Sequence, residues 1–130
     1  MTVLLPQPIP ANGGWTLVDW LDASASSTPA GADGIATITL DQLDTATRWQ
    51  LTHMVAFCTS SGVPQMRLYL NGVTPGNLRD GTSTGVFDVA DWPMGLMVPP
   101  SAQLVAQWTG CNPGDVATLT VQGNVYQRTS

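Results

Sequence analysis

The chain has 130 residues, 43% of them hydrophobic, which is enough for one domain with a proper core and leaves no room for a second. Its formal net charge is −5, and only 10% of its residues are charged. It has no basic stripe and no apolar run of about 18 residues, which argues against direct nucleic-acid binding and against a membrane span. The basic residues are scattered: Arg48, Arg67, Arg79 and Arg128.

The charged residues are of two kinds only, because all nine acids are aspartate and all four bases are arginine. Lysine and glutamate, which populate exposed helix faces, are absent. The abundant Thr, Val, Gly and Pro favour strands and turns instead. A surface poor in charge suggests that much of it contacts other protein. A GC-rich genome would produce the same bias, and both explanations stay open.

Residues 1–14 predict an extended N-terminal arm. Prolines at alternate positions fix φ and remove backbone donors, so this segment cannot be a fully paired central strand. Its apolar side chains nevertheless need a surface, either on their own domain or on a neighbouring subunit; they are Val3, Leu4, Leu5 and Ile9.

The first ten residues lack the basic region and the cleavage pattern of a signal peptide. We therefore expect the protein to be made and assembled in a cytoplasm. Two cysteines, Cys58 and Cys111, do not form a disulfide framework in that compartment, and we expect both to be free thiols.

Residues 15–130 predict β-strands joined by turns, because apolar and polar residues alternate in short stretches bounded by Gly, Pro, Asn and Asp. Asn71-Gly72 is the strongest short turn signal, Pro113-Gly114 is typical of a type II turn, and Gly123 suggests a bulge. Loops are expected at 22–34, 60–64 and 73–84. The expected strands are 15–21, 35–40, 47–59, 66–70, 86–89, 95–98, 103–108 and 116–127.

About eight short strands with no helical pattern predict an all-β, single-domain sandwich of jelly-roll type. The longest predicted strand, 47–59, alternates along its length. Simple alternation puts one set of its residues on one side: Trp49, Leu51, His53, Val55 and Phe57.

No catalytic, cofactor or metal residue is predicted. His53 is the single histidine and is expected to be a satisfied core or edge residue. Cys58, five residues further along an extended strand, should face the opposite side, which argues against a Cys–His dyad. No zinc, calcium or phosphate-binding pattern occurs. We therefore expect a protein that is not an enzyme.

Five tryptophans are many for this length. Trp49 and Trp108 fall within strands and are expected in the core. Trp15, Trp20 and Trp92 fall at strand ends or turns. They either pack in the core or are exposed, and exposed aromatic residues mark protein interfaces or sugar-stacking platforms.

The C-terminal run VPPSAQLVAQWTGCNPGDVATLTVQGNVY resembles small virion proteins of tailed phages that infect actinobacteria. The charge composition and the apolar arm are similar to those proteins as well. The resemblance covers about the last third of the chain. It implies a structural protein of the virion: a capsid decoration protein, a minor capsid protein or a tail-associated subunit. No functional residue carries over, because such proteins act by surfaces.

The sequence thus predicts a capsid decoration protein that forms a homo-oligomer and contacts the major capsid protein or other virion proteins. The alternatives are a tail-associated subunit and a carbohydrate-binding module, on a tail tip or a secreted enzyme, with the three tryptophans at strand ends as its platform. The predicted interface residues are Val3, Leu4, Leu5, Ile9, Trp15, Trp20 and Trp92.

Overall fold

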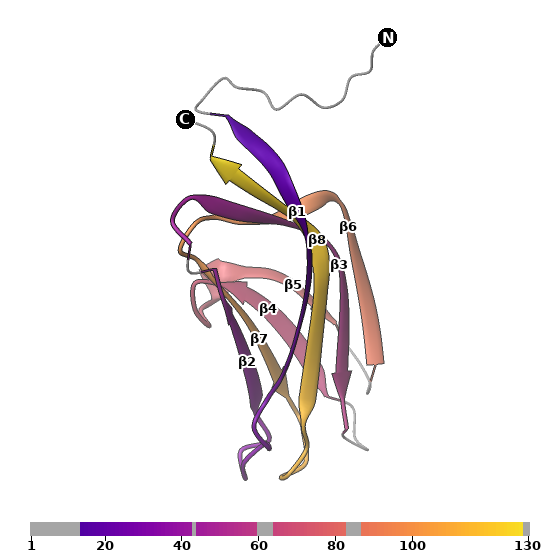
Figure 1. Cartoon of the computed structure of the whole chain (residues 1–130). Coiled ribbons are helices and arrows are strands. Elements are labelled where there is room, and N and C mark those ends of the chain that lie inside the picture. The colour runs from indigo at the N-terminus through magenta and orange to yellow at the C-terminus, as the bar shows by residue number, and fades with distance from the viewer. Residues whose placement is uncertain (1–13, 43, 60–63, 83–86, 129–130) are drawn as a thin grey trace.

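The computed structural model describes residues 14–42, 44–59, 64–82 and 87–128. In this part of the chain eight strands form two four-stranded sheets that pack face to face (Figure 1). Sheet A has the strand order β1-β8-β3-β6, and sheet B has the order β2-β7-β4-β5. The prediction of an all-β sandwich is confirmed.

All strand pairs are antiparallel. The chain changes sheet at every connection except that between β4 and β5, which gives the strand order of a jelly roll built from two Greek keys. A short 3-10 turn, Pro75–Asn77, follows β4. The strands are β1 (Trp15–Ser26), β2 (Ala36–Asp41), β3 (Thr47–Cys58), β4 (Gln65–Leu70), β5 (Leu78–Thr82), β6 (Phe87–Val98), β7 (Gln103–Thr109) and β8 (Ala117–Arg128).

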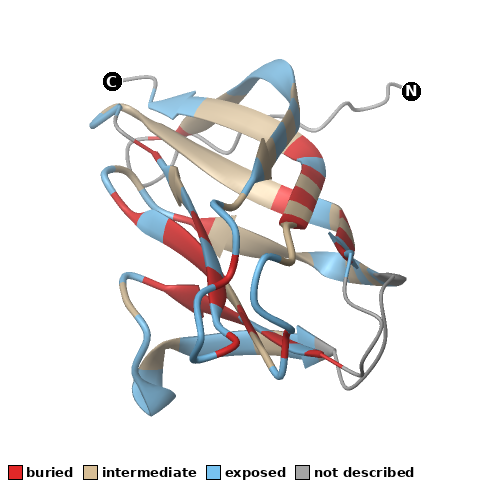
Figure 2. Ribbon diagram, turned by 90° about the horizontal axis from the view of Figure 1, so that it is seen from below, coloured by how far each residue is buried: buried red, intermediate tan, exposed pale blue. Residues whose placement is uncertain are grey.

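The core lies between the two sheets, where the buried segments of the strands face each other (Figure 2). Trp108, which the sequence predicted to lie in the core, is its largest fully buried side chain. Burying a large apolar side chain contributes about 1.5–3 kcal/mol, so this layer is what holds the sheets together. Its other large members are Leu51, Met54, Leu119 and Val121 from sheet A, and Met66, Leu68 and Leu104 from sheet B.

A bulge in β3 changes which of its residues face the core. The register with both neighbouring strands shifts between Leu51 and His53, so Thr52 is an extra residue. After the bulge Met54 is fully buried, whereas Phe57 is 41% exposed. The prediction that His53, Val55 and Phe57 share the buried side of Trp49 and Leu51 is therefore wrong, because one inserted residue reverses a period of two.

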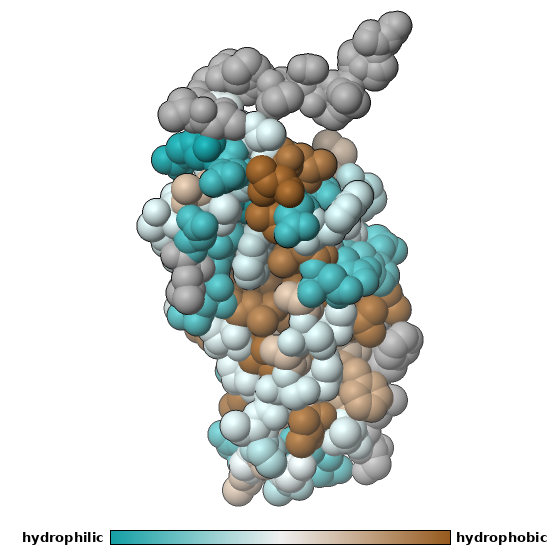
Figure 3. All heavy atoms as spheres, in the orientation of Figure 1, coloured by the Kyte–Doolittle hydropathy of each residue, from teal (hydrophilic) through white to brown (hydrophobic). Residues whose placement is uncertain are grey.

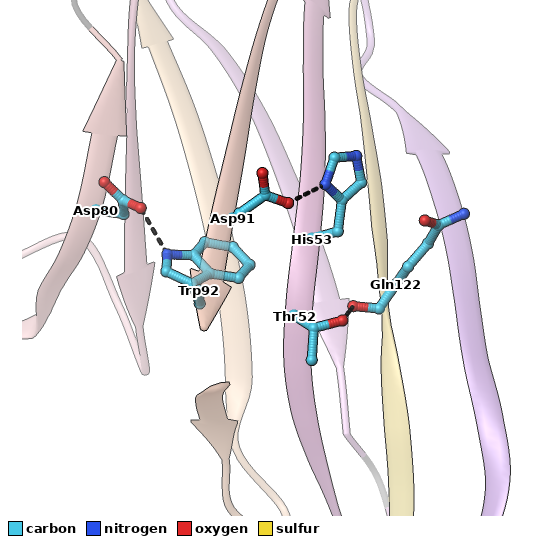
Figure 4. A network of polar contacts seen from close by, with 6 residues as sticks. All are labelled: Thr52, His53, Asp80, Asp91, Trp92 and Gln122. Carbon is cyan, nitrogen blue, oxygen red and sulfur yellow. Dashed lines mark hydrogen bonds and ion pairs between the residues drawn. The ribbon is translucent and has the colours of Figure 1, made fainter. Parts of the chain in front are cut away.

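Gly123 of β8 lies against this bulge. A Cβ atom at this position would be 2.1 Å from the backbone oxygen of Gln50 and 2.9 Å from the Cα atom of Leu51. The sequence suggested a bulge at Gly123, but the extra residue, Thr52, lies in the facing strand. The Thr52 hydroxyl donates a hydrogen bond to the backbone oxygen of Gln122 at 3.4 Å (Figure 4).

β1 is longer than predicted. Residues 22–26 were expected to begin a loop, but Ala23 and Ala25 pack against the core as the inward half of an alternating strand. On the outward half, the Ser24 hydroxyl lies 3.1 Å from that of Thr120, and Ser26 makes the same contact with Thr118. Small polar residues, which by themselves predict a loop, thus form a strand here because they pair with β8.

Two further strands differ from prediction around the edge of the sandwich. The strands predicted at 86–89 and 95–98 are the two ends of one strand, β6. The expected turn at 91–93 is instead part of an irregularity within β6, where residues 92–95 lie opposite Thr52 of β3. β5 forms inside the predicted loop 73–84. The Asn71-Gly72 turn is present, with φ 66° and 121°. Nothing in the described segments is a helix long and apolar enough to cross a membrane.

Replacing Gly123 with alanine should lower the free energy of unfolding by about 2 kcal/mol or more, because β3 must move to admit the new methyl group. Gly76→Ala is the matched control, since a Cβ atom at Gly76 meets nothing within 4 Å. We expect that variant to stay within about 0.5 kcal/mol of the parent. Urea unfolding of the three proteins measures both effects, and equal midpoints would contradict the close approach of β8 to β3.

Candidate interaction surface

Three large apolar side chains are exposed together near the start of β1: Leu17 at 50%, Val18 at 49% and Trp20 at 78%. We call them the β1 patch. β1 is an edge strand, paired only with β8, and Val18 is the extra residue of a bulge between Leu17 and Asp19. Apolar side chains gather toward the upper end of the molecule, where β1 begins (Figure 3).

Trp20 is bordered by polar groups that are held in place. The strand registers put Asn124 of β8 next to Trp20, and Gln50 of β3 next to Asn124. The Gln50 Oε1 atom accepts hydrogen bonds from Asn124 Nδ2 at 3.3 Å and from the Tyr126 hydroxyl at 3.2 Å. The exposed indole therefore lies beside an ordered polar strip on the same sheet.

Trp15, at the first position of β1, carries two guanidinium groups on its ring. The Arg48 Cζ atom lies 4.5 Å from the ring centre and the Arg128 Cζ atom 5.0 Å from it, while Arg48 is also 5.7 Å from the centre of Tyr126. Such cation–π contacts contribute about 0.5–2 kcal/mol each. Two of the four positive charges of the chain are thus fixed where residues 1–14 join the sandwich.

Trp92 has a different role, because it packs against the core. Its Nε1 atom donates a hydrogen bond to Asp80 Oδ2 at 2.6 Å, which joins β6, the edge of sheet A, to β5, the edge of sheet B (Figure 4). β6 and β1 are opposite edges of sheet A. Trp92 and Trp20 therefore do not form one flat platform. The arm residues Val3, Leu4, Leu5 and Ile9 lie outside the described residues.

His53 lies on the outer face of sheet A. Its Nδ1 atom donates to Asp91 Oδ1 at 2.5 Å, and the side chains are 32% and 72% exposed. An exposed pair of this kind contributes about 0–1 kcal/mol. Cys58 is fully buried and faces the opposite side from His53, as predicted. Within the described ranges no three His, Cys, Asp or Glu side chains gather in a way that could hold a metal ion.

The rest of this outer face has little charge. β1 and β8 contribute the serine and threonine pairs described above, whereas β3 and β6 contribute Val55, Phe57 and Val89. Phe57 is 41% exposed and Val89 is 42% exposed. This face therefore combines exposed apolar side chains with hydroxyl groups and few charges, a composition that the cores of protein interfaces share.

No family model and no curated protein matches the sequence. A solved structure of similar fold comes from Bacillus endospore appendages, which form disulfide-linked pili. Its TM-score is 0.50 at 16% identity, and the alignment covers 99% of this chain and 100% of that one. At this identity the likeness supports the fold alone, a sandwich shared with a pilus-forming protein.

Two more distant structures also align. The family 32 carbohydrate-binding module of C. perfringens NanJ, solved with galactose, has a TM-score of 0.45 at 7% identity over 78% of this chain and 93% of that one. The virus-like particle of the extra small virus of the prawn Macrobrachium rosenbergii has a TM-score of 0.39 at 10% identity over 97% and 89%.

The Trp92–Asp80 hydrogen bond predicts a measurable coupling between the two sheet edges. Trp92→Phe keeps most of the ring but removes the donor, and it should lower the free energy of unfolding by about 1–3 kcal/mol, since the acceptor is a carboxylate. With Asp80→Ala it should form a double-mutant cycle whose coupling energy is at least about 0.5 kcal/mol. Trp20→Phe is the matched control on an exposed indole. Strictly additive losses would rule out the bond as a tie between the edges.

Proposed function

We propose that this chain is a structural protein of a virion, a capsid decoration protein of a tailed phage that infects actinobacteria. It acts by binding copies of itself and other virion proteins, foremost the major capsid protein, and it performs no catalysis. The observation that carries the proposal is the β1 patch: exposed apolar residues on an edge strand, directly after the apolar arm.

The β1 patch suits a protein partner. Tryptophan is enriched among the residues that dominate binding energies, and Trp20 is exposed at 78% with two apolar neighbours. The hydrogen-bonded sheet beneath it is already ordered, so binding loses little conformational entropy there. An edge strand also leaves backbone donors and acceptors unpaired by its own sheet, and proteins commonly cover such edges.

The arm supports the same function. Residues 1–14 precede β1 without a break, so a segment bound to a neighbour would leave the sandwich beside the β1 patch. Each buried leucine or isoleucine contributes about 1.5–3 kcal/mol, while ordering costs about 1–2 kcal/mol per residue. The prolines lower that cost because they stiffen the free arm.

The phage assignment rests on the resemblance of the C-terminal run, which forms β7, the following turn and β8. The turn has the expected geometry, with Gly114 at φ 90° and the Asp115 N–H donating to the Asn112 oxygen at 3.1 Å. We place the protein in the virion on this ground, after assembly in the host cytoplasm. A tail-associated subunit would use the same surfaces.

A carbohydrate-binding module is the second candidate. It is favoured by one observation, the exposed Trp20 beside Asn124 and Gln50, because an indole face with adjacent amides suits a sugar ring. The position of Trp92 at the opposite edge of the sheet weighs against the three-tryptophan platform.

Deleting residues 2–12 should leave the thermal melt of the sandwich nearly unchanged and weaken self-association, or binding to capsid shells, by at least about tenfold. The reason is that the arm contributes to contacts between subunits and not to the core. Sedimentation velocity over a concentration series measures self-association, and co-sedimentation with shells measures binding. A truncated protein that does not fold, or that still assembles with full affinity, would contradict the proposal that the arm is a docking element between subunits.

Trp20→Ala should weaken the same assembly by about tenfold or more, with the melt unchanged. Met94→Ala is the matched control, because Met94 is 90% exposed but lies on β6, away from the β1 patch. A stable monomer that is not retained on shells, and that binds a neutral sugar in a Trp20-dependent way, would replace the proposal with the carbohydrate-binding candidate.

A further inference from the structure

The two cysteines, which are 53 positions apart in the sequence, meet inside the sandwich with their Sγ atoms 3.7 Å apart. Cys58 is the last residue of β3 in sheet A, and Cys111 follows the end of β7 in sheet B (Figure 1). Their exposed fractions are 0% and 7%. The pair therefore spans the two sheets, and both thiols are free in this structure.

The backbone holds each cysteine in position. The Cys111 N–H donates to the Gly34 oxygen at 3.0 Å. Gly34 has φ 72°, and a Cβ atom on it would be 2.6 Å from the Cys111 oxygen, so only glycine allows this contact. On the other side Cys58 pairs with Ala117 of β8, and the next N–H, that of Thr59, donates to the Val116 oxygen at 3.0 Å. The two sulfur atoms face each other from fixed points.

We propose that Cys58 and Cys111 form a modification site at which a disulfide bond joins sheet A to sheet B under oxidising conditions. The sequence led us to expect unbridged thiols, because the protein is expected to be assembled in a cytoplasm and has only two cysteines. That expectation is kept here for reducing conditions only. A bond requires the sulfur atoms to approach from 3.7 Å to about 2.05 Å, which side-chain rotation and a small backbone shift can supply.

The oxidant is a small-molecule disulfide of the glutathione class. One cysteine, as its thiolate, attacks the oxidant and forms a mixed disulfide, which releases one small thiol. The second cysteine, after losing its proton, displaces the other small thiol and closes the protein disulfide. Two protein thiols thus lose two protons and two electrons, and the oxidant takes them up to become two thiols.

The buried environment makes this site slow to react in either direction. Burial, the hydrogen bond with Cys58 and the charges of Cys58 and Asp115 together raise the pKa of the Cys111 thiol to about 12. The thiolate is therefore scarce near neutral pH, and the reagent must also reach a covered sulfur. Oxidation is expected over hours in the folded protein and faster during refolding.

The bond would lie at the opposite end of sheet A from the start of β1. The strand registers pair Cys58 with Ala117, whereas Thr47 pairs with Gln127 and Trp15 with Arg128 at the other end. The β1 patch is thus left unchanged. One consequence rests on the proposed function: the subunits assemble with both cysteines reduced in the cytoplasm, and the disulfide joins the two sheets of each subunit after release.

The test uses the full chain, purified reduced and then incubated or refolded with oxidised and reduced glutathione. We expect a mass loss of about 2 Da, one peptide pair linked through Cys58 and Cys111 in a non-reducing digest, and reversal by a reductant. Closing a loop of 53 residues should also lower the equilibrium constant for unfolding by about a thousandfold in urea titrations.

Cys58→Ala and Cys111→Ala are the controls, and neither should gain stability from oxidation. Glutathione adducts without an internal bond, dimers linked through these cysteines, a bond that destabilises the fold, or thiols that survive oxidative refolding would each overturn the proposal. The non-reducing digest decides this in the parent protein even if a variant does not fold. Because the readouts concern the isolated chain, their failure is separate from a failure of self-association.

Discussion

The arrangement of this sandwich depends on the contact between β3 and β8 at the Thr52 bulge. Thr52 is inserted in the registers with both neighbouring strands, and Gly123 lets the β8 backbone lie against β3 at that point. A period of two cannot absorb one extra residue, so the half of β3 after the bulge turns over. Met54, Ala56 and Cys58 enter the core, and the residues between them turn outward.

Both surfaces of sheet A follow from this reversal. On the inside, Cys58 contacts Cys111 across the core, so the two thiols of the chain lie side by side. On the outside lie Val55 and Phe57, which would face the core in a strand without the bulge. His53 also faces outward there and contacts Asp91. The outer face gains exposed apolar area between the polar strip of β8 and the edge of β6. A protein that acts by contact needs such area, and it is continuous with the sheet that carries the β1 patch.

Alternation and turn chemistry were enough to predict the sandwich, because they are local signals: Asn71-Gly72 and Pro113-Gly114 lie where expected. The Thr52 bulge was missed because an inserted residue has no signature of its own in a strand that stays alternating on both sides. The extension of β1 to Ser26 and the strand β5 depend on pairing with β8 and β4, which are distant in sequence. For Trp20 and Trp92 alike the sequence left core packing and exposure open, and only the fold shows that Trp20 is exposed and that Trp92 packs against the core. The meeting of the cysteines also required the fold.

Native-state labelling of two engineered thiols tests the reversal of β3 most directly. In a Cys58→Ala/Cys111→Ala background, Phe57→Cys and Met54→Cys would each be treated with a maleimide while folded. Phe57 is 41% exposed and Met54 is fully buried, so the thiol at position 57 should react at close to its rate in the unfolded chain and the thiol at position 54 should be strongly protected. Fast labelling at position 54 with protection at position 57 would show an unbulged strand and contradict this account.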